Sequence, residues 1–152
     1  MDVFEAMETA RTMRWLKPDP VPDELIDKLL WAATRAEARA IRNTCTATLR
    51  DHEVKGRGYI DCTDEAYLKL FDGPAWRLRQ ERGLQKGTNV RDHLDIVELS
   101  AIKLTEALAS ERISVEDARG NSECKEATGR TATNVRWAID SERKDRQRRL
   151  VR

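Results

Sequence analysis

Three cysteines and two histidines are the side chains best able to bind a metal or act as nucleophiles in this chain. They are Cys45, Cys62, Cys124, His52 and His93. No two cysteines form a CxxC pair, and no spacing matches a zinc signature. An odd number of cysteines fits a reducing compartment better than a disulfide framework. We therefore expect isolated thiols, no metal site and a cytoplasmic protein.

Asp92 and His93 are adjacent, and a carboxylate beside an imidazole can support acid–base chemistry. An Asp at the start of a helical stripe more commonly serves as the N-cap of the helix, and an adjacent His is then an exposed neighbour. We expect that capping role for Asp92 and assign no catalytic residue in the chain.

The last twelve residues, SERKDRQRRLVR, carry six basic and two acidic side chains, although the whole chain has a net charge of only +1. Such a density of cations can follow a phosphate backbone or bind an acidic partner. The cations are Arg143, Lys144, Arg146, Arg148, Arg149 and Arg152. The alternative is a solvated helix end, in which Glu142 and Asp145 form local ion pairs. No aromatic residue lies within this tail, which disfavours binding of single-stranded nucleic acid.

Composition limits the fold that can position these residues. The chain has 152 residues, of which 39% are apolar, 36% charged and only 5% aromatic. Its mean hydropathy is −0.70. Few aromatic residues disfavour an all-β fold, and no apolar window is long enough to cross a membrane. Acidic residues near the start also differ from the basic start of a signal peptide. We therefore expect a soluble, mainly α fold of one or two small domains.

Helical spacing of apolar residues predicts an N-terminal helical arm over residues 1–38. One helix follows Asp2 and ends before the proline-rich stretch, and a second covers residues 22–38. Residues 39–62 show no sustained period and contain two glycines, so we expect a linker there. The arm and linker are followed by a helical domain at residues 63–140 and the basic tail at residues 141–152.

The strongest periodicity of the chain lies in the expected helical domain, and it predicts a long helix packed along a partner. Its members are spaced 4, 3, 4, 3 and 4 residues apart: Val90, Leu94, Val97, Ala101, Leu104 and Leu108. A last helix has a stripe of mostly small residues: Cys124, Ala127, Thr131, Val135 and Ala138. We expect these two helices to form an antiparallel hairpin at the centre of a small bundle. The same spacing is also consistent with a homodimer.

Four tryptophans are candidates for stacking on a ligand. They are Trp15, Trp31, Trp76 and Trp137. Each lies on or beside an apolar helical stripe, so we expect them to pack in the core.

The opening MDVFEAMETARTMRWLKPDPVPDELIDKLLWAATRA resembles the N-terminus of the nitroreductase family of flavin enzymes. The resemblance implies that Arg11, Thr12 and Arg14 contact the phosphate of FMN, with two cations and a hydroxyl donor around a dianion. It stops after Ala36, and the segments that hold the flavin ring in this family do not follow. As the alternative function it implies a truncated oxidoreductase that binds FMN and uses NAD(P)H.

Residues 58–140 resemble the C-terminal region of the DNA damage-inducible protein D and phage antirepressor group. The matching motifs are Leu70-Phe71-Asp72-Gly73, Arg91-Asp92-His93, and Val135-Arg136 with Ile139. The resemblance implies a non-enzymatic regulatory module without a cofactor, which binds a protein of the DNA-repair or repression machinery. The basic tail adds nucleic acid as a further partner. We expect this function in preference to the flavin enzyme.

Overall fold

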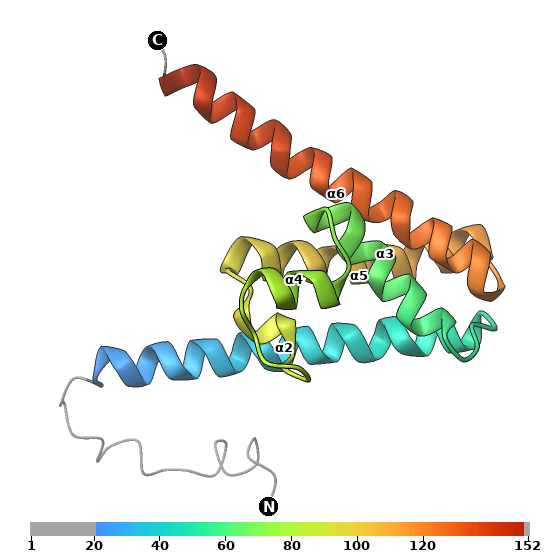
Figure 1. The fold of residues 1–152 in the computed structure, drawn as a ribbon, viewed down its shortest axis with the longest axis horizontal. Helices are drawn as coiled ribbons and strands as arrows, with labels where there is room; N and C mark the ends of the chain where they lie inside the picture. The colour runs from blue at the N-terminus through green and yellow to red at the C-terminus, as the bar shows by residue number, and fades with distance from the viewer. Residues whose placement is uncertain (1–20, 151–152) are drawn as a thin grey trace, which may run out of the picture. The chain divides into compact units, whose positions relative to one another are not determined.

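The computed structural model describes residues 21–150, and in this range the chain forms helices and no strand. The elements are α2 (Asp23–Asp51), α3 (Gly58–Phe71), α4 (Ala75–Glu81), the 3-10 helix η2 (Val90–His93), α5 (Ile96–Glu116) and α6 (Gly120–Leu150), as Figure 1 shows. The expectation of a mainly α fold is confirmed. The first expected helix and the proline-rich connector up to residue 20 lie outside the described residues.

The chain divides into two compact units, residues 1–34 and residues 35–152. The described part of the first unit is the beginning of α2. Asp23 and Glu24 lie in its first turn, where negative charge is favoured by the helix dipole. The hydroxyl of Thr34 donates to the carbonyl oxygen of Leu30 over 2.9 Å, a bond that lies within the helix.

The structure differs from the expected linker at residues 39–62. The helix α2 continues to Asp51 and α3 begins at Gly58, so most of this segment is helical. The second half of α2 has one inward stripe, formed by Ala38, Arg42, Cys45 and Leu49 at spacings of 4, 3 and 4. All but Arg42 are buried. Apolar periodicity missed this stripe because an arginine, an alanine and a cysteine occupy three of its four positions.

A tight turn joins α2 to α3 and is held against the start of α6. The side chain of Asn121 accepts a hydrogen bond from the backbone N–H of Lys55 over 2.9 Å and donates to the carbonyl oxygen of Lys55 over 3.1 Å. We call these two hydrogen bonds between Asn121 and Lys55 the clamp. Gly58 lies next to it, and a Cβ added to Gly58 would be 2.3 Å from Oδ1 of Asn121. The glycine is therefore required by close approach.

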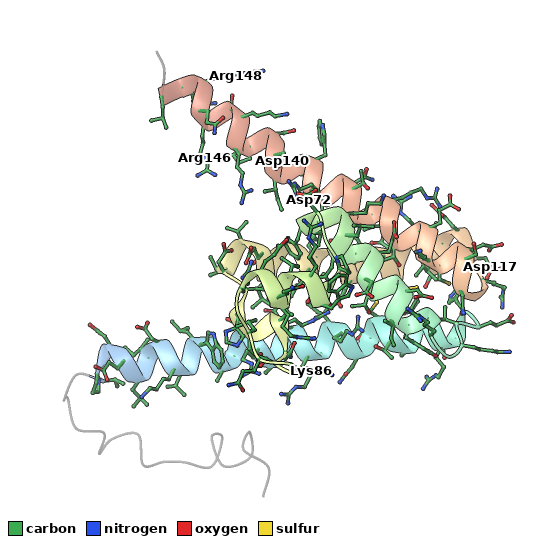
Figure 2. All side chains as sticks on the ribbon, in the orientation of Figure 1. Asp72, Lys86, Asp117, Asp140, Arg146 and Arg148 are labelled. Atoms are coloured by element: carbon green, nitrogen blue, oxygen red, sulfur yellow. The ribbon has the colours of Figure 1, made fainter. Side chains whose placement is uncertain are left out.

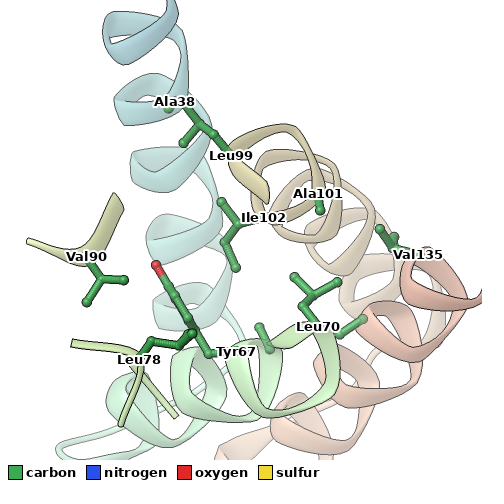
Figure 3. Packing of buried hydrophobic residues seen from close by; sticks show 11 residues of the cluster. Ala38, Tyr67, Leu70, Leu78, Val90, Leu99, Ala101, Ile102 and Val135 are labelled. Carbon is green, nitrogen blue, oxygen red and sulfur yellow. The ribbon is translucent and has the colours of Figure 1, made fainter. Parts of the chain in front are cut away.

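Two groups of buried side chains form the core of the second unit. The first contains Tyr67 and Leu70 of α3 and Ile102 of α5, which Figure 3 shows together with their neighbours. The second group contains the three cysteines and Ile113 of α5. Both groups also contain small residues of α6, such as Ala132 in the first and Ala127 in the second. The small residues allow α6 to pack closely on α3 and α5.

The buried face of α5 differs from the one that the heptad spacing predicts. Ile102 and Ile113 are fully buried, whereas Val97, Leu104 and Leu108 are 45%, 50% and 40% exposed. The predicted stripe is wrong for those three residues. The real face also contains Thr105 and Glu106, which are buried polar residues that an apolar pattern leaves out.

The start of α5 also lies later than predicted. Val90 belongs to η2, and α5 begins after Asp95. The carboxylate of Asp95 accepts from the N–H of Glu98 over 2.8 Å, and Glu98 accepts from the N–H of Asp95 over 2.9 Å. This capping box stops the helix from extending back to residue 90. Asp92 does not cap α5, so the capping role that we expected for it is wrong.

Residues 117–119 join α5 to α6, and the two helices pack on each other. Asp117 has a φ of 49° and ends α5 in the left-handed conformation. Four of the five residues in the predicted α6 stripe are buried, namely Cys124, Ala127, Thr131 and Val135, and Ala138 is exposed. The antiparallel arrangement of this pair stays a prediction.

Candidate interaction surface on the last helix

The C-terminal part of α6 continues past the residues that pack in the core, as Figure 1 shows. Ile139 is the last apolar residue of α6 that packs against a core cluster. No residue from 140 to 150 is buried. A regular helix therefore presents its side chains to solvent over its last three turns.

Arg136 fixes α6 to the end of α3 at the point where the exposed part begins. Its Nη1 donates to the carbonyl oxygen of Leu70 and lies 3.3 Å from Oδ2 of Asp72. Its Nε donates to Oδ2 of Asp140 over 2.8 Å. Figure 2 shows Asp72 and Asp140 where α6 passes the end of α3. These acidic side chains, its hydrogen bond to Asp140 foremost, raise the pKa of Arg136 above its usual value.

The basic tail forms some of the local ion pairs that are expected of a solvated helix end, and contact with a partner stays a prediction. Glu142 pairs with Arg146 at 3.7 Å, and Asp145 pairs with Arg149 at 3.0 Å, one helical turn apart in each case. These are the local pairs expected of a solvated helix end. The other tail cations in the described range, Arg143, Lys144 and Arg148, make no ion pair with residues 21–150. Arg152 lies outside the described residues.

Three exposed side chains of α6 lie on one face of the helix. At about 100° per residue, Trp137, Lys144 and Arg148 fall within a sector of about 40°. Trp137 is 72% exposed, and both cations are exposed. We call these three residues the exposed stripe of α6. Arg143 lies on another face, where it lines a hollow of about 230 Å³ together with Arg136 and Leu70.

The expectation that the tryptophans pack in the core is wrong for the three that the structure describes. Trp31, Trp76 and Trp137 are 52%, 59% and 72% exposed, and Trp15 lies outside the described residues. The sequence held a signal for Trp137, because it lies off the stripe formed by Thr131 and Val135. That stripe of small residues is the part of α6 that packs in the core.

The residues that the nitroreductase resemblance assigns to FMN phosphate lie outside the described range. Arg11, Thr12 and Arg14 all precede residue 21, so their geometry toward a phosphate is not part of the structure. The flavin assignment therefore stays a prediction.

The three cysteines are buried free thiols. Desolvation by burial raises the pKa of Cys62 to about 12, with smaller contributions from neighbouring groups. Burial also raises the pKa values of Cys45 and Cys124. Thiols with raised pKa values carry little thiolate and are poor nucleophiles. Within residues 21–150, no group of three or more potential ligand side chains could hold a metal ion.

Among the described residues, no acidic side chain pairs with either histidine in the way that acid–base chemistry would need. Asp92 forms an ion pair with Arg35 at 2.6 Å, and the backbone carbonyl of His93 accepts from Arg82. Nδ1 of His52 lies 3.0 Å from the carbonyl oxygen of Ala118, which connects two turns. These contacts give the side chains of Asp92 and His52 a structural role, whereas the side chain of His93 is exposed.

Glu106 is the most deeply buried carboxylate among the described residues, at 4% exposure. Arg42 donates to it over 2.9 Å, and Arg91 donates to both of its oxygens. Burial alone would lower the pKa of Arg91, but its bond to Glu106 and the charge of that carboxylate raise it overall. Desolvation raises the pKa of the neighbouring Tyr67 hydroxyl. Local spacing in the sequence does not reveal this cluster because its members are far apart in the chain.

Comparison with known proteins leaves the family of this chain open. No protein-family model matches the sequence, and no curated protein matches it significantly. Both resemblances therefore stay predictions. Among the helices of residues 21–150, none is long and apolar enough to cross a membrane.

Proposed function

We propose that this chain is a non-enzymatic interaction module that binds an acidic macromolecular partner through the exposed stripe of α6. The observation that carries the proposal is that Trp137 lies on the same face of α6 as Lys144 and Arg148, two exposed cations that form no ion pair with residues 21–150. Both cations lie beyond Ile139, the last apolar residue of α6 that packs against a core cluster. The resemblance of residues 58–140 to the DNA damage-inducible protein D and antirepressor group supports a protein partner of the DNA-repair or repression machinery.

The geometry of α6 suits the recognition of a partner. Trp137 and Arg148 are eleven residues apart, which corresponds to about 16 Å along a helix. The pairs formed by Arg146 and Arg149 with their acidic neighbours support the helix on its other faces. The stripe is thus displayed on an ordered element, and less entropy is lost on binding than with a flexible tail.

Trp137 favours nucleic acid as a second candidate partner. Single-stranded nucleic acid is bound by cations that follow its backbone and by aromatic side chains on which bases stack. Trp137 supplies the aromatic group that the tail itself lacks. An exposed tryptophan is also a common anchor in protein interfaces, so both partner classes use the same stripe.

Two double variants of equal charge test the proposed surface. K144A/R148A removes both cations of the exposed stripe, whereas R146A/R149A removes two cations that pair with acidic residues elsewhere on the helix. The probes are a fluorescently labelled single-stranded oligonucleotide, a labelled duplex and a labelled glutamate-rich peptide. Anisotropy titrations measure the affinity of each protein for each probe.

We expect K144A/R148A to weaken binding about tenfold or more, and R146A/R149A to weaken it less. Equal losses in the two variants would show that overall charge alone drives binding and would contradict the proposal. Absence of binding by the unaltered chain to all three probes would also contradict it. The probe that binds most tightly identifies the partner class.

The flavin alternative is tested separately by absorbance and turnover. The proposal predicts a colourless purified protein that does not oxidise NAD(P)H when FMN is added. A yellow protein with flavin absorbance and NAD(P)H-dependent activity would overturn the non-enzymatic function and support the nitroreductase-type alternative through Arg11, Thr12 and Arg14.

A further inference from the structure

A cleft of about 260 Å³ in the second unit is lined by four arginines. They are Arg35, Arg39, Arg42 and Arg91, and the remaining lining residues are Ala38, Asn89, Asp92 and Leu99. We call this the arginine cleft. It is formed by the second half of α2, by η2 and by the start of α5. We propose that it binds a compact phosphate group, either inorganic phosphate or the phosphate of a small monoester.

The charges around the arginine cleft do not balance. One carboxylate, Asp92, lines the cleft, and a second, Glu106, contacts two of its arginines; both form ion pairs. Asp92 pairs with Arg35 at 2.6 Å, and Glu106 is shared between Arg42 and Arg91. Four guanidinium groups against two carboxylates leave an excess of two positive charges. A phosphate monoester carries a charge of about −1.5 to −2 near neutral pH, which matches this excess.

Two of the guanidinium groups are held in place before any ligand binds. Arg42 donates to Glu106 over 2.9 Å and to the hydroxyl of Thr63 over 2.8 Å. Arg91 is held by Glu106, and its side chain is 16% exposed. Donors that are fixed by buried partners lose little entropy when a ligand arrives, so the cleft is preorganised.

Arg39 is the cation with the fewest constraints in the arginine cleft. It is exposed and forms no ion pair within residues 21–150. It lies one residue from the buried Ala38 and one turn before Arg42 on α2. A guanidinium group can form two parallel hydrogen bonds to phosphate oxygens. Arg39 is therefore placed to contact an anion that also faces Arg42.

The size and walls of the cleft favour a small anion. Sites for drug-sized ligands commonly have volumes of about 300–1,000 Å³, so a cleft of about 260 Å³ suits a phosphate group with a small substituent. Ala38 and Leu99 are buried and form an apolar part of the wall. Apolar walls keep water away and strengthen the attraction between arginine and phosphate.

Isothermal titration calorimetry of the full chain tests the proposal with inorganic phosphate and with a nucleoside 5′-monophosphate as probes. We expect saturable binding of at least one probe at constant ionic strength. Arg39→Ala should weaken that binding about tenfold or more, because one charge-assisted contact is lost. Arg50→Ala is the matched control, since Arg50 lies on the same helix and pairs with Asp51 outside the cleft. It should bind like the unaltered chain.

Two results would overturn the proposal: no saturable heat with either probe, or equal affinities in Arg39→Ala and the unaltered chain. Tighter binding of the monophosphate would identify an organic phosphate as the ligand, and tighter binding of phosphate the free ion. Arg39→Lys should retain part of the affinity, which separates loss of charge from loss of fold. K144A/R148A should bind phosphate normally, so this test is independent of the proposed function of α6.

Discussion

Arg42 on α2 donates a hydrogen bond to Glu106 on α5, with 2.9 Å between Nη1 and Oε1. The two residues are separated by 64 positions in the sequence, and Arg91 contacts the same carboxylate. A carboxylate that is only 4% exposed is tolerated because two guanidinium groups compensate it. This contact ties the second half of α2 to the core of the second unit, where the sequence led us to expect a linker.

The Glu106 cluster predicts a large loss of stability when its carboxylate is removed. Glu106→Ala leaves Arg91 largely buried without a charge partner, so we expect the free energy of unfolding to fall by about 3–5 kcal/mol. Urea unfolding followed by circular dichroism measures the change. Glu126→Ala is the control, because its side chain is 72% exposed and its pair with Arg130 is long at 3.9 Å; we expect less than about 0.5 kcal/mol there. Similar losses in both variants would show that Glu106 is not buried in this network.

The register of α5 predicts opposite outcomes for two residues that lie two positions apart. Ile102 is fully buried, so Ile102→Ala should cost about 2–5 kcal/mol of unfolding free energy. Leu104 is 50% exposed, so Leu104→Ala should cost less than about 1 kcal/mol. Urea unfolding compares the two. If Leu104→Ala lost more unfolding free energy than Ile102→Ala, the buried face of α5 would be the one that the heptad spacing predicts.

The clamp at the start of α6 predicts that Gly58 and Asn121 act as a unit. In Gly58→Ala, the new methyl group would collide with the Asn121 side chain, which must then rotate and lose its two bonds to Lys55. We expect Gly58→Ala and Asn121→Ala to cost about 1–3 kcal/mol each. The double variant should cost clearly less than the sum of the two, as thermal or urea unfolding can measure. Additive losses would mean that the two residues do not meet.

The buried thiols predict a loss of stability in alkaline solution. The unfolded thiol of Cys62 ionises near its ordinary pKa of 9.0, whereas the folded thiol ionises at about 12. Above pH 9 the unfolded state therefore releases a proton that the folded state keeps, and the free energy of unfolding falls as the pH rises. Below that pH this group should contribute no pH dependence. Urea unfolding at several pH values measures the slope.

Cys62→Ala provides the comparison for the alkaline series. The variant should lose part of the slope above pH 9, and the remaining slope should come from Cys45, Cys124 and, at higher pH, Tyr67, whose pKa values are also raised by burial. An identical slope with and without Cys62 would show that its thiol is not buried as the structure has it.

The sequence predicted helices well where one face is apolar and less well where polar residues lie inside. The start of α2 and four of the five residues in the small-residue stripe of α6 follow simple spacing rules and are confirmed. The second half of α2 was missed because Arg42 interrupts its inward stripe, and only Glu106, 64 positions away, explains it. Heptad spacing also placed the wrong face of α5 inside, since Thr105 and Glu106 belong to the buried face. Long-range pairs of this kind cannot be derived from local spacing.

The charge of the basic tail correctly indicated an exposed helix end. The arrangement of side chains on its surface could be derived only in part from the sequence. Spacing alone predicts the pairs of Arg146 and Arg149, because each acidic partner lies one turn before. The exposure of Trp137 depends on which residues of α6 fill the core. The predicted stripe of small residues already placed Trp137 off the buried face of α6, but the structure was needed to show that Trp137, Lys144 and Arg148 are exposed together.

The salt dependence of binding tests the proposed surface most directly. The affinity for the labelled single-stranded oligonucleotide is measured over a series of salt concentrations, and the logarithm of the binding constant is plotted against that of the salt concentration. For a single strand, each direct phosphate contact adds roughly 0.7 to the magnitude of the slope. If Lys144 and Arg148 make such contacts, K144A/R148A should lower that magnitude by about 1.4, and R146A/R149A should change it less. Equal slopes for the unaltered chain and K144A/R148A would contradict nucleic-acid contact through the exposed stripe of α6.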